Sequence, residues 1–140
     1  TRRLAADPPF RRRLRRARLE SAARRAQRTA VKRLRGALGA HGSDVQLHRA
    51  RKAAKRARYA AEALAASDRS QARAALRFEQ LQEILGEHQD AVVAADTARR
   101  LGVADDAGAV GFSFGLLCAA QQHAAAQARR EARRWLRRGR

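Results

Sequence analysis

The sequence predicts an all-α protein, an antiparallel four-helix bundle, and three observations support this class. Alanine and arginine, two strong helix formers, recur along the whole chain. Both prolines, Pro8 and Pro9, stand near the start, so no proline interrupts the remaining sequence. No stretch alternates apolar and polar residues in the way that a half-buried strand does. A length of 140 residues fits one domain.

Turn-forming residues divide the chain into four predicted helices. Asp7, followed by Pro8 and Pro9, is typical of a helix start, with a capping residue and a proline in the first turn. Ser43 or Asp44 is expected to cap the second helix. The third helix either continues through glycine 86 or bends there. The expected helices cover about 8–38, 45–66, 71–101 and 109–138. Their short connections predict antiparallel neighbours.

Apolar residues recur at helical spacing in each of these segments and define a predicted core. His88 falls within the third apolar stripe. Cys118 lies in an apolar run and is expected to be a buried structural thiol, because a lone cysteine cannot form a disulfide within the chain. The predicted core residues are Leu19, Ala23, Ala26, Ala30, Leu34 and Leu38, then Leu47, Ala50, Ala54, Ala57, Ala61 and Leu64, then Phe78, Leu81, Leu85 and Val92, and finally Phe114, Leu117, Ala124, Ala128 and Trp135.

The charge balance is strongly basic. The formal net charge is +19, from 32 basic and 13 acidic residues. Such a chain repels itself and attracts polyanions, namely nucleic acid, polyphosphate or an acidic membrane surface. The plain alternative is a solvated surface that reflects a codon bias toward alanine and arginine. Because no apolar run reaches transmembrane length and no signal peptide is recognised, we expect no membrane insertion and a cytoplasmic setting.

The second predicted helix carries a dense, mainly cationic row of side chains in an arc of roughly 120°, separate from its apolar stripe. Arg49 and Arg56 flank the row. Like charges at i,i+3 and i,i+4 destabilise an isolated helix by a few tenths of a kcal/mol per pair, so the row is easier to explain if an anion lies among them. The alternative is a solvated face. The row consists of His48, Arg51, Lys52, Lys55, Arg58, Tyr59 and Glu62.

The chain lacks the sequence patterns of common catalytic and metal sites. It contains no Walker-type phosphate loop, no Cys/His cluster with zinc spacing and no pair of carboxylates that suggests acid–base work. The four histidines are scattered over different segments. We therefore expect no enzymatic activity, no cofactor and no metal. Glu79, Glu83, Glu87 and Asp90 are interpreted as a solvated helix face or as ion-pair partners within the protein.

The run from Leu47 to Glu62 follows the pattern Leu-His-x-x-Arg-Lys-x-x-Lys-Arg-x-Arg-Tyr-x-x-Glu and resembles the signature of the CHAD domain, the conserved histidine α-helical domain. The segment from Leu81 to Asp90 is similar to the family's Leu-Gln-x-x-Leu-Gly-x-x-x-Asp. Residues 112–115 followed by Trp135 resemble its last helix. The resemblance implies non-catalytic binding of inorganic polyphosphate along a basic channel. It assigns this role to His48, Arg51, Lys52, Lys55, Arg56 and Arg58.

Other cations and polar residues on the predicted helices are secondary candidates. They are Arg24, Arg28, Lys32, Tyr59, His123, Arg130 and Arg134. Because the resemblance is to the second of the family's two bundles, residues 1–140 are expected to be one helical domain, the second half of a CHAD-like domain. The expected partner is then a preceding N-terminal bundle or a second copy of the chain.

Two further classes of function remain open from the sequence. A basic helical module can bind nucleic acid non-specifically through phosphate contacts. Aromatic residues make up only 4% of the chain, and no recognition motif for bases is present, which disfavours this class. The third class is a regulatory or scaffolding module of a polyphosphate-processing enzyme, and it is compatible with polyphosphate binding. Competition between polyphosphate and nucleic acid separates the first two classes.

Overall fold

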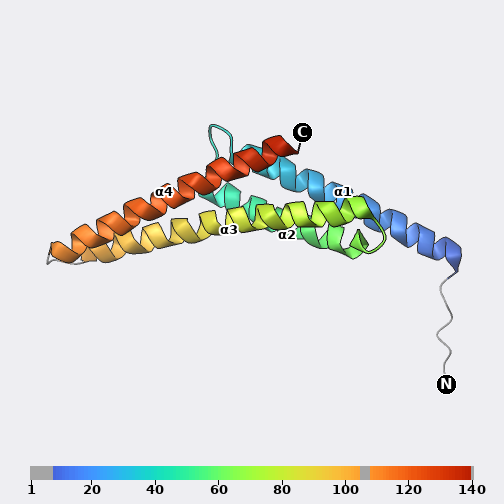
Figure 1. The fold of residues 1–140 in the computed structure, drawn as a ribbon, viewed down its shortest axis with the longest axis horizontal. Coiled ribbons are helices and arrows are strands. Elements are labelled where there is room, and N and C mark those ends of the chain that lie inside the picture. Colours follow the sequence, from blue (N-terminus) through green and yellow to red (C-terminus); the bar gives the residue numbers. More distant parts are fainter. Residues whose placement is uncertain (1–7, 105–107, 140) are drawn as a thin grey trace, which may run out of the picture.

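The computed structural model describes residues 8–104 and 108–139, which form four α-helices (Figure 1). The predicted helices agree with the observed ones to within three residues, so the all-α class and the four-helix bundle are confirmed. The third helix continues through Gly86 without a break. The helices are α1 (Pro9–Ala37), α2 (Asp44–Ala65), α3 (Arg69–Ala104) and α4 (Ala109–Arg138).

Side-chain caps begin α2 and α3. The Ser43 hydroxyl accepts a hydrogen bond from the Gln46 backbone N–H at 3.2 Å, and the Gln46 side chain accepts one from the Ser43 backbone N–H at 3.0 Å. This reciprocal pair is a capping box, so Ser43 is the cap of the two predicted candidates. Asp68 Oδ1 accepts from the backbone N–H of Ser70 at 2.8 Å and of Gln71 at 3.3 Å. The Ser70 hydroxyl also donates to this oxygen, at 2.7 Å, and this bond, aided by the two backbone bonds, lowers the pKa of Asp68. With this cap, α3 starts two residues earlier than predicted.

Proline and glycine define the two ends of α1. A proline stands in the first turn, as the sequence predicts, because Pro9 is the first helical residue. The N-cap position, however, is occupied by Pro8 and not by Asp7, which lies outside the described residues. After α1, the chain turns back into α2 through a close approach of Gly42 to the carbonyl oxygen of Ala37. A Cβ at position 42 would overlap that oxygen, so the turn requires glycine.

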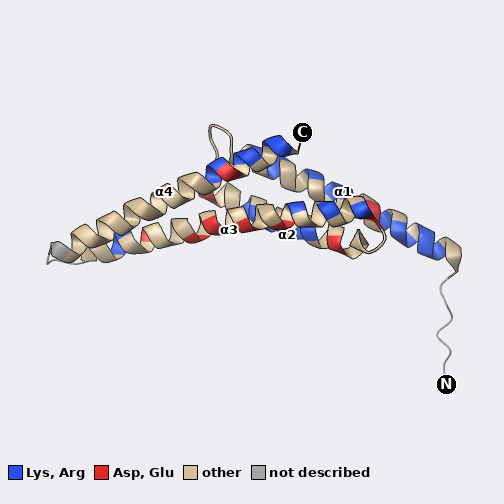
Figure 2. Ribbon diagram, in the orientation of Figure 1, with Lys and Arg blue, Asp and Glu red and all other residues tan. Residues whose placement is uncertain are grey.

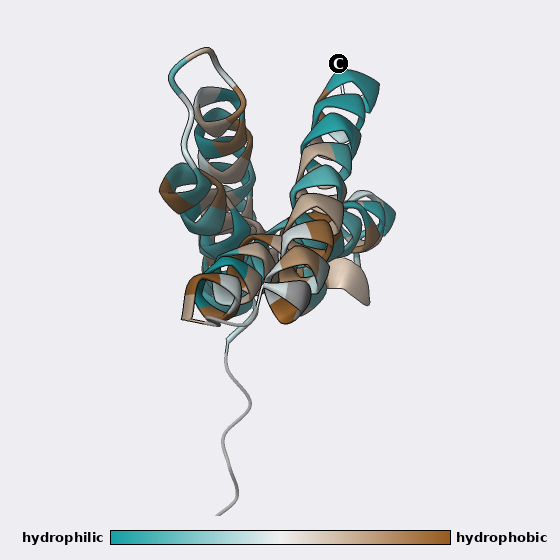
Figure 3. Cartoon of the chain, turned by 90° about the vertical axis from the view of Figure 1, so that its left-hand side faces the viewer, coloured by the Kyte–Doolittle hydropathy of each residue, from teal (hydrophilic) through white to brown (hydrophobic). Residues whose placement is uncertain are grey.

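Consecutive helices run antiparallel, and each packs on the next, whereas α1 and α4 meet only over a short stretch. Figure 3, which views the molecule along its long axis, shows the C-terminal end of α4 standing apart from the connection between α1 and α2. At 1.5 Å per residue, α3 is about 54 Å long and α2 about 33 Å. The C-terminal part of α3 therefore passes beyond α2 and pairs with α4 alone (Figure 1).

The core lies where all four helices meet, and alanine dominates it. Small side chains let the helices approach closely, and a few large ones fill the remaining space. Phe78 and Trp135 pack with their ring centroids 5.4 Å apart. The central cluster consists of Ala30, Leu34, Ala37, Leu38, Leu47, Ala50, Ala53, Ala54, Ala57, Phe78, Leu81, Ile84, Leu85, Ala132 and Trp135.

The structure corrects three core predictions. Leu19 is 49% exposed, because α1 buries no residue before Ala23. Leu117 is 47% exposed, because this part of α4 packs on α3 alone and one of its faces stays open. The thiol of Cys118 is half-buried for the same reason, rather than buried as expected. None of the described helices contains a stretch long and apolar enough to cross a membrane.

Candidate functional site

The cations of α2 do not lie on one surface, because the two neighbouring helices divide them. Arg51 and Arg58 are directed toward α3 and line a groove there. Arg49 and Arg56 are directed toward α1 and line a second groove. Lys52 and Lys55 point outward and are exposed. The row that the sequence predicts as one site therefore falls into three parts with different surroundings. Figure 2 shows the distribution of basic and acidic residues over the helices.

The groove between α2 and α3 has a volume of about 350 Å³. Acidic side chains in its lining compensate the positive charge of its arginines. Arg58 Nε lies 2.7 Å from a carboxylate oxygen of Glu62, and its Nη2 lies 3.2 Å from one of Glu79. Hydrogen bonding to Glu62 raises the pKa of Arg58. Of the two interpretations of the acidic residues, ion pairing within the protein therefore holds for Glu79. The carboxylates that line the groove are Glu79, Glu83, Glu87 and Asp90.

Arg51 lies across the backbone of α3 at Gly86. Its Nη2 is 3.4 Å from the position that a Cβ on residue 86 would take. The guanidinium thus lies close against α3, at a distance that would be an ordinary van der Waals contact for a Cβ, and the half-buried Arg51 helps to hold α2 on α3. His48 acts in the same way, because its Nδ1 lies 2.8 Å from Oε1 of Gln89. Since an amide oxygen can only accept, Nδ1 of His48 carries the proton.

In the groove between α1 and α2, the acidic side chains that the structure describes do not compensate the positive charge. The volume of this groove is about 830 Å³, and among the described residues its lining contains four cations and no carboxylate. Lys32 and Arg33 come from α1, and Arg49 and Arg56 come from α2. All four are exposed, and none forms an ion pair with another described residue. Cations of both helices therefore face one hollow without compensation, which concentrates positive potential there. We call this hollow the α1–α2 groove.

The outer face of α2 extends the basic surface from the α1–α2 groove. Lys52 and Lys55 are exposed, and Lys55 Nζ lies 5.7 Å from the ring centroid of Tyr59. Tyr59 is 51% exposed, and the guanidinium carbon of Arg58 lies 5.8 Å from the same ring centroid. The ring therefore holds two cations at cation–π distance. An anion in the α1–α2 groove can reach these lysines without crossing a carboxylate of α3.

Apart from Tyr59 on the outer face of α2, the secondary candidates are spread over three surfaces. Arg28 and Lys32 line a further groove, between α1 and α3, whereas Arg24 is exposed on α1. The remaining three lie exposed on α4 and are absent from the described linings of both α2 grooves. Arg134 lies 3.8 Å from Glu131. The structure thus does not join these three to the cations of α2. They are His123, Arg130 and Arg134.

Sequence reasoning missed Arg33 and gave Arg49 only a flanking place. Each stands at the edge of its helix's apolar stripe, Arg33 directly before Leu34 and Arg49 directly before Ala50. A cation next to the apolar stripe of its helix is expected to line a groove between that helix and a neighbour. The sequence pattern of one helix does not show which neighbouring helix forms the other side of the groove.

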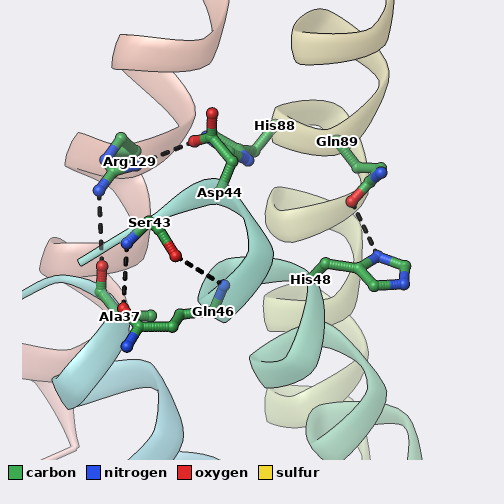
Figure 4. Close-up of polar contacts among 8 residues, drawn as sticks. All are labelled: Ala37, Ser43, Asp44, Gln46, His48, His88, Gln89 and Arg129. Atoms are coloured by element: carbon green, nitrogen blue, oxygen red, sulfur yellow. Dashed lines mark hydrogen bonds and ion pairs between the residues drawn. The ribbon is translucent and has the colours of Figure 1, made fainter.

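A polar junction around the buried His88 joins all four helices (Figure 4). His88 is 3% exposed, and its Nε2 lies 3.2 Å from Asp44 Oδ1. The same oxygen is 3.2 Å from Nη1 of Arg129, whose Nη2 donates to the carbonyl oxygen of Ala37 at 3.5 Å. Burial lowers the pKa of His88, and Asp44 opposes this shift only in part. Within the described part of the chain, no group of three His, Cys, Asp or Glu side chains is placed to hold a metal ion.

Fold and site together define a class of protein, an all-α helical bundle whose cations gather in grooves between antiparallel helices. Within this class, the model of the CHAD domain matches residues 1–99. The match covers α1, α2 and most of α3 and ends before α4. The chain therefore belongs to the CHAD domain family, as the sequence motifs predict. No curated protein and no solved structure matches the chain.

Proposed function

We propose that this protein binds inorganic polyphosphate, or a closely similar polyanion, in the α1–α2 groove and over the outer face of α2. The observation that carries the proposal is the groove lining itself, in which the described part of the chain places four unpaired cations from two helices and no carboxylate. Membership of the CHAD domain family supports the choice of polyphosphate among polyanions.

The chemistry of the groove suits a chain of phosphates. Arg33, Arg49 and Arg56 present planar guanidinium groups, which can bind two oxygens of one phosphate through parallel hydrogen bonds. Lys32 adds a compact point charge. A groove between two antiparallel helices is also extended along their axes, so successive phosphates can contact successive cations. Each phosphate that is neutralised releases condensed counterions and adds to the affinity.

The α2–α3 groove is a weaker candidate for the same ligand. Arg58 already has two carboxylate partners, and Glu83 and Glu87 would repel an entering anion. We therefore assign Arg51, Arg58 and His48 to the packing of α2 on α3, and we assign direct binding to Arg56, Lys52 and Lys55 with the cations of the α1–α2 groove. This proposal divides the residues that the family resemblance treats as one set.

The proposed role is binding without catalysis. The described residues that line the α1–α2 groove include no histidine and no carboxylate that could serve as a general base for hydrolysis. The proposal places this binding in the cytoplasm, as the sequence analysis expects. Incubation of the protein with polyphosphate and Mg²⁺ should leave the length of the polymer unchanged, and shortening that persists through purification would contradict the non-catalytic role.

Two double variants test the assignment of the groove. Arg49→Gln with Arg56→Gln removes two cations from the α1–α2 groove, and Arg51→Gln with Arg58→Gln removes two from the α2–α3 groove. Both variants lose the same net charge, so general electrostatic attraction is matched. Titration calorimetry with long-chain polyphosphate should show that the Arg49 and Arg56 variant loses affinity at least about tenfold, since two charged hydrogen-bond partners are lost. The Arg51 and Arg58 variant should lose affinity about threefold or less, because carboxylates already compensate the charges that it removes.

Circular dichroism of both variants checks that the helices persist. The proposal fails if the Arg51 and Arg58 variant loses more affinity than the Arg49 and Arg56 variant. Competition identifies the class of polyanion. Polyphosphate should displace duplex DNA at equal phosphate concentration, while DNA should fail to displace polyphosphate. The reverse order would assign the groove to nucleic acid.

A further inference from the structure

A second cationic groove lies on the other flank of α1, between α1 and α3. Its volume is about 630 Å³, and it shares Lys32 with the α1–α2 groove. No carboxylate of residues 8–104 or 108–139 lines it. We call this hollow the α1–α3 groove. It is lined by Gln27, Arg28, Val31, Lys32, Arg35, Arg77 and Phe78.

Three of its cations form a row along α1. Arg28, Lys32 and Arg35 stand at i, i+4 and i+7, so they follow one side of the helix over about 10 Å. All three are exposed, and none forms an ion pair with another described residue. A row of this length suits several connected phosphates better than a single anion.

The fourth cation, Arg77 of α3, is held in place before any ligand arrives. Its guanidinium carbon lies 4.3 Å from the ring centroid of Trp135, at cation–π distance. The indole N–H of Trp135 donates to the carbonyl oxygen of Arg77 at 2.9 Å, which fixes the two residues together. A side chain at Gly139 would overlap the guanidinium, so glycine there leaves space for Arg77. A cation with a fixed orientation binds an anion at a smaller entropic cost.

The floor of the α1–α3 groove is apolar, which distinguishes it from the α1–α2 groove. Phe78 and the half-buried Val31 line it, whereas the α1–α2 groove has no aromatic residue in its lining. Gln27 adds a hydrogen-bond acceptor. Its Nε2 donates to the buried Gln71 at 2.9 Å, so its Oε1 is directed away from that bond and accepts from no other described residue.

We propose that the α1–α3 groove is a binding site for a nucleoside polyphosphate. The phosphates lie along Arg28, Lys32 and Arg35, with Arg77 closing the other side. The nucleoside covers the apolar floor, and Gln27 Oε1 accepts a hydrogen bond from an amino group of the base or a ribose hydroxyl. The volume is within the usual range of about 300–1,000 Å³ for pockets that hold small molecules. The inference is independent of the polyphosphate site, although the two ligands share Lys32.

Titration calorimetry of the whole chain with ATP, tripolyphosphate and adenosine tests the proposal. We expect ATP to bind one to one and at least about fivefold more tightly than tripolyphosphate, because burial of the nucleoside on the apolar floor adds free energy. Adenosine alone should not bind measurably, because it lacks the charges. The single tryptophan, Trp135, stacks on Arg77 and supplies a second readout, so ATP should change its fluorescence.

Matched variants separate the two grooves. Arg28→Gln with Arg35→Gln should weaken ATP binding at least about tenfold, since two charged contacts are lost. Arg49→Gln with Arg56→Gln removes the same charge from the α1–α2 groove and should change ATP affinity by about twofold or less. Equal losses of ATP affinity in the two variants would overturn the proposal, as would tripolyphosphate binding as tightly as ATP. A wild-type chain that binds polyphosphate but not ATP overturns this inference alone, and the opposite result overturns the proposed function alone.

Discussion

His88 in α3 and Asp44 at the start of α2 are joined at 3.2 Å between Nε2 and Oδ1, although His88 is almost fully buried. Asp44 also lies 3.2 Å from Nη1 of Arg129 in α4. One carboxylate thus connects three helices, and Arg129 extends the connection to α1 through the carbonyl oxygen of Ala37. This junction therefore ties the end of α1 and the start of α2 to the middle of α3 and to α4.

The junction predicts a loss of stability in mild acid. Burial lowers the pKa of His88 below its ordinary 6.5, so the folded protein holds the neutral ring. The unfolded chain takes up a proton near pH 6.5, while the folded chain does so only at lower pH. The unfolded state therefore binds more protons in this interval, and stability falls as pH decreases from about 6.5 through the folded pKa. Thermal unfolding between pH 8 and pH 5 measures the fall.

Two histidine variants identify the residue that is responsible for this pH dependence. His88→Gln keeps a polar side chain at the junction but cannot titrate, so it should flatten the decline in the thermal midpoint. His123→Gln serves as the control, because His123 is exposed on α4. A His88→Gln protein with the same pH profile as the wild type would show that other groups cause the decline.

The alanine seam of α2 predicts a large difference between two identical substitutions. Ala54 is fully buried between the helices, whereas Ala63 is exposed on the same helix. Ala54→Leu should destabilise the fold by about 1–3 kcal/mol, because extra methylene groups force the close helices apart. Ala63→Leu should change stability by less than about 0.5 kcal/mol. Urea unfolding followed by circular dichroism compares them, and similar values for both would mean that α2 is not tightly packed.

The fold could be predicted largely from the sequence, because each helix carries its own apolar stripe. All six stripe residues predicted on α2, from Leu47 to Leu64, are buried. Leu19 and Leu117 occupy equivalent places in the stripes of α1 and α4, yet they are exposed. Their exposure depends on how far the neighbouring helices reach. Helix periodicity reports which side is apolar and does not report where the partner helix ends.

The candidate site could be predicted only in part, for a related reason. The motif in α2 marks its cations, but Arg49 and Arg51, two positions apart, lie in different grooves. Arg49 faces other cations, whereas Arg51 faces a row of carboxylates. This division depends on which flank of α2 each neighbour covers. The Arg77–Trp135 stack joins α3 to α4 across 58 positions in the sequence and has no local signal.

Binding in the α1–α2 groove predicts stabilisation by the ligand. Unpaired cations repel one another in the free protein, and an anion that binds only the folded state stabilises it by linkage. Long-chain polyphosphate should therefore raise the thermal midpoint by several degrees, and orthophosphate should raise it less at equal phosphorus, because connected phosphates bind at a high effective concentration. The rise should be reduced in the Arg49→Gln and Arg56→Gln variant. A midpoint that does not respond to polyphosphate would contradict specific binding.

The last prediction concerns the carboxylates that compensate the α2–α3 groove. If Glu83 and Glu87 exclude anions from it, then Glu83→Gln with Glu87→Gln should open a second cationic surface beside Arg51. Glu79 stays, because it is paired with Arg58. Removing two nearby negative charges should strengthen polyphosphate binding about three- to tenfold at low salt, and the gain should shrink as salt screens it. Asp96→Asn with Glu131→Gln is the matched control, because it changes the net charge equally at positions outside the groove. An equal gain in both variants would mean that only net charge matters. A gain confined to the Glu83 and Glu87 variant, and lost again when Arg51→Gln is added, would show that the acidic row of α3 restricts polyphosphate to the other side of α2.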